Sequence, residues 1–149
     1  MKEDMLGRLS KKLFDFSCGV AGMQADASLV GMDGPLWHRV VATAVQAAAR
    51  TETDPFDESS EHLISWYEDA RKAMTETHCL LKVIQKMGLL PKKKEAKKLL
   101  ELSRQLMYEV NSTARSMRQI IDEEQQARYD EFAGSMKEAM EEPESESEE

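Results

Sequence analysis

Between residues 61 and 87, apolar and small side chains recur at alternating intervals of three and four, and this pattern constrains the fold more than any other feature. Its members are Leu63, Trp66, Ala70, Ala73, Thr77, Leu80, Ile84 and Met87. The spacing places them on one side of an α-helix. A second row, Tyr67, Met74 and Leu81, repeats every seven residues beside the first. Together the two rows are wider than the stripe that a two-stranded coiled coil buries, so the sequence predicts a helix of a multi-helix bundle.

The composition favours a single globular domain. The chain has 149 residues, of which 41% are hydrophobic and 32% charged, and only four prolines and seven glycines interrupt it. No apolar run approaches the roughly 20 residues of a membrane span, and the first residues lack the hydrophobic core of a signal peptide. We therefore expect a cytoplasmic protein without a membrane partner. Cys18 and Cys79 lie inside helical patterns with no CxxC partner, which predicts two buried thiols.

Two helices are expected in the first third of the chain. One covers residues 2–24, where Leu6, Leu9, Leu13, Phe16, Val20 and Met23 share a face. Polar residues and glycines predict a break over 25–34, and Pro35 suits the start of a second helix that ends near Thr51. That helix is built of small residues, so either its own bundle or a second copy should surround it. Packing in the core or in an oligomer is expected for Trp37, Val41, Ala44, Ala48, Trp66 and Tyr67.

The second half of the chain predicts a long helical hairpin. Asp57 or Ser59 is expected to cap the helix over 61–87, and Gly88 is expected to end it. After Pro91 the same spacing returns in Ala96, Leu99, Ser103, Leu106, Val110, Thr113, Met117 and Ile120. Helices joined by so few residues must lie antiparallel. The predicted fold is therefore all-α, an antiparallel up-down four-helix bundle over residues 1–121.

Two further segments follow the predicted bundle. Residues 122–140 carry a weaker apolar line, Tyr129, Phe132, Met136 and Met140, and either the fourth helix continues through them or a short helix is appended. Such a line on a projecting helix is expected to dock onto the protein's own body or onto a neighbouring subunit. Residues 141–149 hold six acidic side chains and predict a disordered acidic tail.

The formal net charge is −8, and removal of residues 141–149 reduces it to −2. A nearly balanced body with an acidic tail argues against a protein that binds nucleic acid over its whole surface. One local exception is a cluster of lysines at the start of the fourth predicted helix: Lys92, Lys93, Lys94, Lys97 and Lys98. Positive charge there opposes the helix macrodipole, so the cluster does not serve helix stability. Three interpretations remain: a binding patch for phosphates or an acidic protein, a solvated face, or a partner for the acidic tail of the same or another chain.

The sequence contains no recognisable catalytic or metal-binding motif. GxGxxG, GxxxxGK[ST], GxSxG and HExxH are all missing. None of the three histidines, His38, His62 and His78, has a glutamate three positions before it, which excludes the usual carboxylate-bridged di-iron bundle. We expect no catalytic residues, no metal, no cofactor and no small-molecule substrate, and hence a non-enzymatic protein.

The layout resembles a known bacterial family. The residues that carry the likeness are the short helix with residues 37–44, Glu76 in the third helix, and the Gly88-Leu89-Leu90 turn. Over residues 6–121 the chain is similar to the four-helix bundle proteins encoded in intervening sequences of large ribosomal RNA genes. This family includes the accessory variability proteins of diversity-generating retroelements. Residues 46–51 and the lysines that begin the fourth helix depart from the family's pattern.

The resemblance implies a homopentamer and, in the retroelement branch, association with a reverse transcriptase and its RNA through a basic surface. Arg39, which matches the family's second helix, and the five lysines are the candidate binding residues. Two functional hypotheses follow. The first is a homo-oligomeric adaptor that accompanies a nucleic-acid-processing enzyme, and the second is direct binding of RNA or DNA by the lysine cluster.

Overall fold

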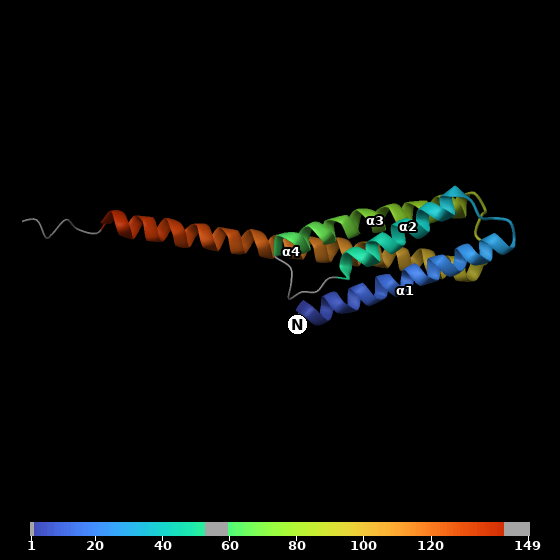
Figure 1. Ribbon diagram of the computed structural model, residues 1–149, viewed down its shortest axis with the longest axis horizontal. Coiled ribbons are helices and arrows are strands. Elements are labelled where there is room, and N and C mark those ends of the chain that lie inside the picture. The colour runs from blue at the N-terminus through green and yellow to red at the C-terminus, as the bar shows by residue number, and fades with distance from the viewer. Residues whose placement is uncertain (1, 53–59, 142–149) are drawn as a thin grey trace, which may run out of the picture.

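The computed structural model describes residues 2–52 and 60–141, and all regular structure in these ranges is α-helical. Its helices are α1 (Lys2–Leu29), α2 (Pro35–Thr51), α3 (Ser60–Lys86) and α4 (Lys93–Glu141) (Figure 1). The predicted all-α class with four helices is confirmed. The predicted caps at Asp57 and Ser59 and the acidic residues 142–149 lie outside the described residues.

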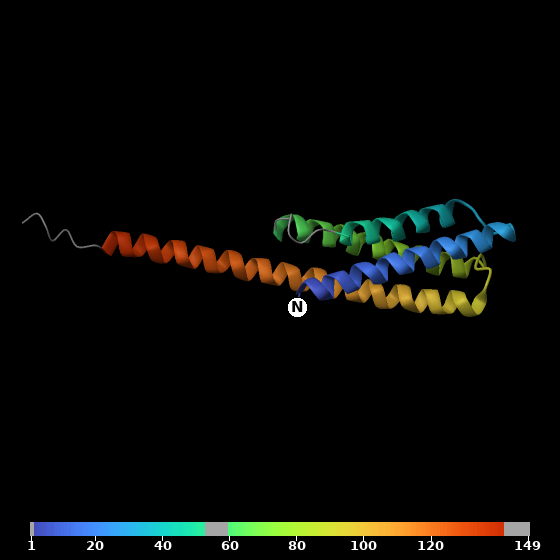
Figure 2. The same cartoon turned by 60° about the horizontal axis from the view of Figure 1, so that its bottom comes forward.

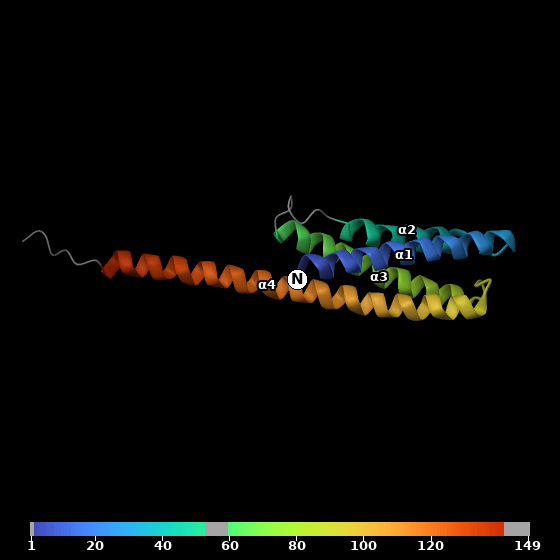
Figure 3. The same ribbon diagram turned by 90° about the horizontal axis from the view of Figure 1, so that it is seen from below.

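Each helix contacts two of the other three, so the four helices form a closed ring of neighbours. Contacts join α1 to α2, α2 to α3, α3 to α4, and α4 back to α1. The α1–α2 connection and the α3–α4 connection lie at the same end of the molecule, and we call this the turn end (Figures 1 and 2). α4 is much longer than its neighbours and leaves the other three helices at the opposite end, as Figure 3 shows from below.

In both short connections, the preceding helix ends in the same way, at a glycine with a positive φ. Gly31 and Gly88 have φ values of 71° and 73°, in the left-handed region that favours glycine. After α1, Gly31 N donates to Ser28 O and Met32 N donates to Ala27 O. After α3, the amides of Gly88 and Leu89 donate to Gln85 O and Ile84 O in the same pattern. This pair of bonds defines the Schellman motif, so the predicted role of Gly88 is confirmed.

The predicted end of the first helix at Gln24 is wrong. α1 continues to Leu29, and the break is limited to residues 30–34. Ala27 extends the buried row of Val20 and Met23 by another turn and is completely buried. Burial against the bundle therefore outweighs the unfavourable helix propensities of Gly19 and Gly22.

The prediction of two buried thiols is also wrong, since Cys18 and Cys79 are both exposed. Each cysteine lies two residues after a buried position, Phe16 in α1 and Thr77 in α3. Two residues correspond to roughly 200° around an α-helix, so both side chains point away from the core.

The predicted packing positions differ in how deeply they are buried. Trp37, Ala44, Ala48 and Tyr67 are buried, whereas Val41 and Trp66 are half-buried. In α3 the most buried line is Tyr67, Ala70, Met74, Thr77, Leu81 and Ile84, so the predicted face is rotated toward the second row. Met87 is 59% exposed because α3 ends at Lys86, one residue before it.

Candidate interaction surfaces on helix α4

The lysine cluster lies at the turn end of the molecule, in the first turns of α4 and just before it. Lys92 pairs with Asp26 of α1 at 3.3 Å and with Glu95 at 3.9 Å. Lys93, Lys94, Lys97 and Lys98 are exposed, and none of them has an ion pair within the described residues. Four of the five predicted binding lysines therefore present uncompensated positive charge to solvent.

The end of α3 adds to this basic surface. Lys82 and Lys86 are exposed in the last turns of α3, and a short turn connects that helix to the lysines of α4. The turn is held from two sides. Gly88 closes α3, and the indole Nε1 of Trp37 donates to Leu89 O at 3.2 Å. A buried tryptophan on α2 thus positions the segment from which the lysine cluster begins.

Arg39, the sixth predicted binding residue, lies elsewhere. Its Nε and Nη2 contact Glu76 Oε1 at 2.8 and 2.7 Å, which joins α2 to α3. α2 and α4 share no contact in the described part of the chain. The structure therefore does not bring Arg39 together with the lysines, and its guanidinium is already engaged by a carboxylate.

A histidine–serine pair connects α3 to α4. His78 Nδ1 lies 2.7 Å from Ser103 Oγ, and that hydroxyl donates to Leu100 O at 2.7 Å. Because a serine has one proton to donate, His78 must be the donor in their shared bond. Burial lowers the pKa of His78, and the charges of Lys82 and Arg104 lower it further, against an opposing effect of Glu101.

This pair is a structural connection rather than a nucleophile with its base. A nucleophilic serine donates its proton to the histidine, whereas Ser103 donates to a backbone carbonyl and is completely buried. We did not predict the pair from the sequence. The signal was present in the hairpin itself, because His78 and Ser103 lie at similar distances on either side of the turn.

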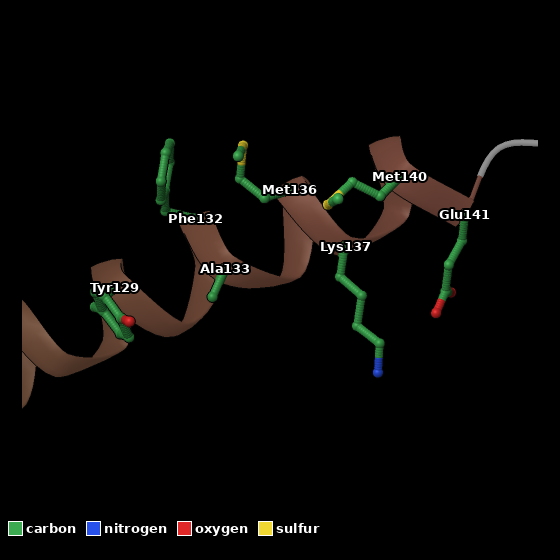
Figure 4. A pocket seen from close by; sticks show the side chains of 7 residues that line it. All are labelled: Tyr129, Phe132, Ala133, Met136, Lys137, Met140 and Glu141. Atoms are coloured by element: carbon green, nitrogen blue, oxygen red, sulfur yellow. The ribbon is translucent and has the colours of Figure 1, made fainter.

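The second candidate surface is the part of α4 beyond the bundle, residues 122–141, which we call the extension. α4 continues through it without interruption, and every side chain in it is exposed. Tyr129, Phe132, Met136 and Met140 are 66%, 65%, 51% and 82% exposed. They line a shallow surface hollow with Ala133, Lys137 and Glu141 (Figure 4). The extension also carries seven acidic and two basic side chains.

These two surfaces cannot meet within one chain. Lys98 and Glu141 are separated by about 65 Å along a straight helix. Residues 142–149 span at most roughly 28 Å when fully extended. The acidic residues that follow α4 therefore cannot reach the lysine cluster of their own chain, which leaves only another chain among the tail-pairing alternatives.

An apolar hollow that we did not predict lies where α4 leaves the bundle. It lies between α1, α3 and α4, and its lining includes Met5, Leu6, Leu63, Met117, Ile120 and Ile121. It lies next to the first turns of the extension, so apolar surface is accessible on both sides of the point where α4 leaves its neighbours.

Comparisons with known proteins gave no match among family models, curated proteins or solved structures. Within residues 2–52 and 60–141, no group of three or more histidine, cysteine or acidic side chains has a geometry that could hold a metal ion. None of the helices described is long and apolar enough to cross a membrane.

Proposed function

We propose that this protein is a non-enzymatic, homo-oligomeric adaptor that accompanies a reverse transcriptase or another nucleic-acid-processing enzyme in the bacterial cytoplasm. The proposed protomer is an antiparallel up-down four-helix bundle, and the proposed assembly is the pentamer implied by the resemblance described above. The observation that carries the proposal is that α4 presents two chemically different exposed surfaces at its two ends.

The separation of these surfaces suits an adaptor. α4 has 49 residues, which correspond to a straight helix of about 73 Å. The lysine cluster begins it and the apolar residues of the extension end it. A continuous helix of this length allows one partner to bind at each end without contact between the two partners.

The outer face of α2 supports association of several copies. Ala42, Val45 and Ala49 are exposed along one side of this helix, and Val45 is 49% exposed. Small side chains permit close approach of a second backbone. In an oligomer this face would add a contact that the isolated bundle leaves open to solvent.

Light scattering tests the proposal directly. For the full chain we expect a solution mass near five times 16.9 kDa. A chain truncated after Ile121 should be measured beside it, to separate association of the bundle from association of the extension. A monomeric full chain at micromolar concentration would contradict the proposed assembly.

Direct binding of RNA or DNA is the second candidate function. The observation that favours it is the set of four uncompensated lysines, with Lys82 and Lys86 at the same end of the molecule. Five copies in a ring would multiply weak phosphate contacts. Binding should weaken steeply with added salt, because each phosphate contact releases counterions.

The test replaces Lys92, Lys93, Lys94, Lys97 and Lys98 by glutamate and measures retention of a labelled single-stranded RNA across a salt series. Loss of retention in this variant, together with normal retention after Lys11→Glu and Lys72→Glu, would assign RNA binding to the cluster. If the full chain retains no RNA at low salt, the direct-binding hypothesis is wrong and the adaptor hypothesis is unaffected.

A further inference from the structure

The side of α4 that faces away from the bundle carries positive charge well beyond the lysine cluster. The exposed residues on this side recur at intervals of three, four and seven: Lys94, Lys97, Glu101, Arg104, Tyr108 and Arg115. On a helix of 3.6 residues per turn, all six lie within about 40° of one direction. Leu106 and Val110 lie on the opposite side of the helix and are buried. We call the six exposed residues the basic face of α4.

The acidic side chains of this part of α4 are already neutralised. Three of them precede residue 122, and they pair as Glu95 with Lys92, Glu101 with Arg104, and Glu109 with Lys12 of α1. Unpaired cations remain on the basic face and beside it. Six exposed cations of α4 have no ion pair within the described ranges: Lys93, Lys94, Lys97, Lys98, Arg115 and Arg118.

An exposed aromatic ring lies in the middle of this charge. Tyr108 is 58% exposed, and the guanidinium carbon of Arg104 lies 5.8 Å from the centroid of its ring. A ring in this position adds little to the core of the bundle, because it lies opposite the buried side of α4. Aromatic rings and guanidinium planes are the groups on which the bases of single-stranded nucleic acids stack.

The combination of charge and ring distinguishes between possible occupants. An acidic protein segment requires the cations but has no use for an exposed ring between them. A duplex keeps its bases stacked inside, so Tyr108 would have no base to contact. A membrane surface requires an apolar face, and the basic face has no aliphatic residue. A single strand uses both features, because its phosphates contact cations while its unpaired bases stack on aromatic rings.

The acidic extension limits this surface. Asp122 and Glu123 are exposed where α4 leaves the bundle, and they follow Arg118 within about one and a half turns. Their charge repels phosphates. From Lys93 to Arg118 the helix rises by about 37 Å, so the cations are distributed over a length that a strand of several nucleotides can follow.

We propose that the basic face of α4 binds single-stranded nucleic acid, with phosphates along its cations from Lys93 to Arg118 and a base stacked on Tyr108. This inference rests on the second candidate function, direct binding of RNA or DNA, and specifies a single strand as the ligand. It extends the binding surface about 30 Å beyond the lysine cluster and adds Tyr108, Arg115 and Arg118 to it.

Fluorescence anisotropy with a labelled single-stranded RNA of about 12 nucleotides tests the inference on the full chain. Tyr108→Ala should weaken binding at least fivefold, because base stacking on an aromatic ring is lost. Tyr108→Phe keeps the ring and should bind within about twofold of the wild type. Tyr129→Ala is the matched control, since Tyr129 is an exposed tyrosine of α4 outside the basic face. It should leave binding unchanged.

The charged part of the surface has its own test. Arg115→Glu with Arg118→Glu should weaken binding and make it less dependent on salt, because fewer phosphates are neutralised. Lys11→Glu with Lys72→Glu is the control, since both lysines are exposed on other helices. It should leave the salt dependence unchanged.

The outcomes separate the inference from the candidate function on which it rests. If the wild type binds RNA but Tyr108→Ala and the double arginine variant bind equally well, the inference is wrong and the lysine cluster alone accounts for binding. If the full chain binds no RNA at low salt, the inference and direct binding are both wrong. Tighter binding of a duplex RNA of the same sequence would overturn the choice of a single strand. A poly-glutamate peptide that binds as tightly as the RNA, with no effect of Tyr108→Ala, would assign the surface to an acidic protein and overturn the inference.

Discussion

Two buried polar atoms lack a hydrogen-bond partner in the described part of the chain, Tyr67 Oη and Asn111 Oδ1. Tyr67 is completely buried in the core between α3 and its neighbours. Its ring contributes a large buried apolar area, whereas its hydroxyl is desolvated without compensation. The same residue therefore stabilises the fold with one part and destabilises it with another.

We expect Tyr67→Phe to leave the free energy of unfolding unchanged or to raise it by up to about 1 kcal/mol, because it removes only the unpaired hydroxyl. Urea unfolding followed by circular dichroism measures the difference. Tyr129→Phe is the matched control, since Tyr129 is exposed in the extension. A loss of more than about 1 kcal/mol in Tyr67→Phe would mean that the hydroxyl makes a stabilising hydrogen bond in solution.

Alkaline pH gives an independent test of the same residue. Burial raises the pKa of Tyr67 from 10.0 to about 12. Between these values the unfolded chain loses the phenolic proton while the folded chain keeps it, so stability falls as pH rises from 10 toward 12. The full effect of two pKa units is about 3 kcal/mol. Tyr67→Phe should remove this part of the alkaline loss, and an identical pH dependence in both proteins would contradict the buried phenol.

At the scale of elements, the α3–α4 hairpin contains a half-buried histidine with a lowered pKa. His78 has a lowered pKa and donates to the buried Ser103 hydroxyl. As pH falls below 6.5, the unfolded chain takes up a proton more readily than the folded chain, and stability decreases. His78→Asn keeps a donor near the position of Nδ1 and cannot titrate in this range. We expect its free energy of unfolding to change less than that of the wild type between pH 7 and 5, with His62→Asn as the control.

The turn of the same hairpin depends on a residue whose backbone has the left-handed conformation. Gly88 has φ of 73°, and Gly88→Ala should cost about 1 kcal/mol in the free energy of unfolding. Gly134→Ala is the opposite control, because Gly134 is in the helical extension and an added Cβ meets nothing within 4 Å. It should increase helix content slightly. Equal effects of the two substitutions would contradict the Schellman motif after α3.

The ends of a helix could be predicted from the sequence where a strong local signal marks them. Pro35 begins α2 as predicted, and Gly88 ends α3. Gly31 was not recognised as a helix end, because several glycines and polar residues nearby gave the same local signal.

Contacts between helices are harder to predict than helix ends. Facing positions such as His78 and Ser103 require the register between helices, which the spacing within each helix does not contain. The lysine cluster was visible because it opposes the helix macrodipole, whereas the pairing of Arg39 with Glu76 depends on contact between helices.

At the scale of the whole molecule, charge and shape are both asymmetric. Residues 1–121 carry a net charge of +2, and residues 122–149 carry −10. The uncompensated lysines lie at the turn end, and the extension projects from the other end (Figure 1). A molecule with this polarity presents different chemistry at its two ends, so each end can be varied separately in binding experiments.

The extension is exposed along its whole length in the single chain, so association with another copy is expected to stabilise it. Most helical stability in proteins comes from packing of an apolar face, and the apolar residues of the extension are exposed in the single chain. If copies associate through the extension, amide hydrogen exchange in residues 125–140 should slow at least tenfold as protein concentration rises from well below to well above the association range. Exchange in the buried turns around Val20 and Leu106 should stay slow throughout. Phe132→Glu with Met136→Glu should keep exchange in the extension fast at every concentration. Slow exchange there in a demonstrated monomer would mean that the helix is stable alone and does not need association to stay ordered.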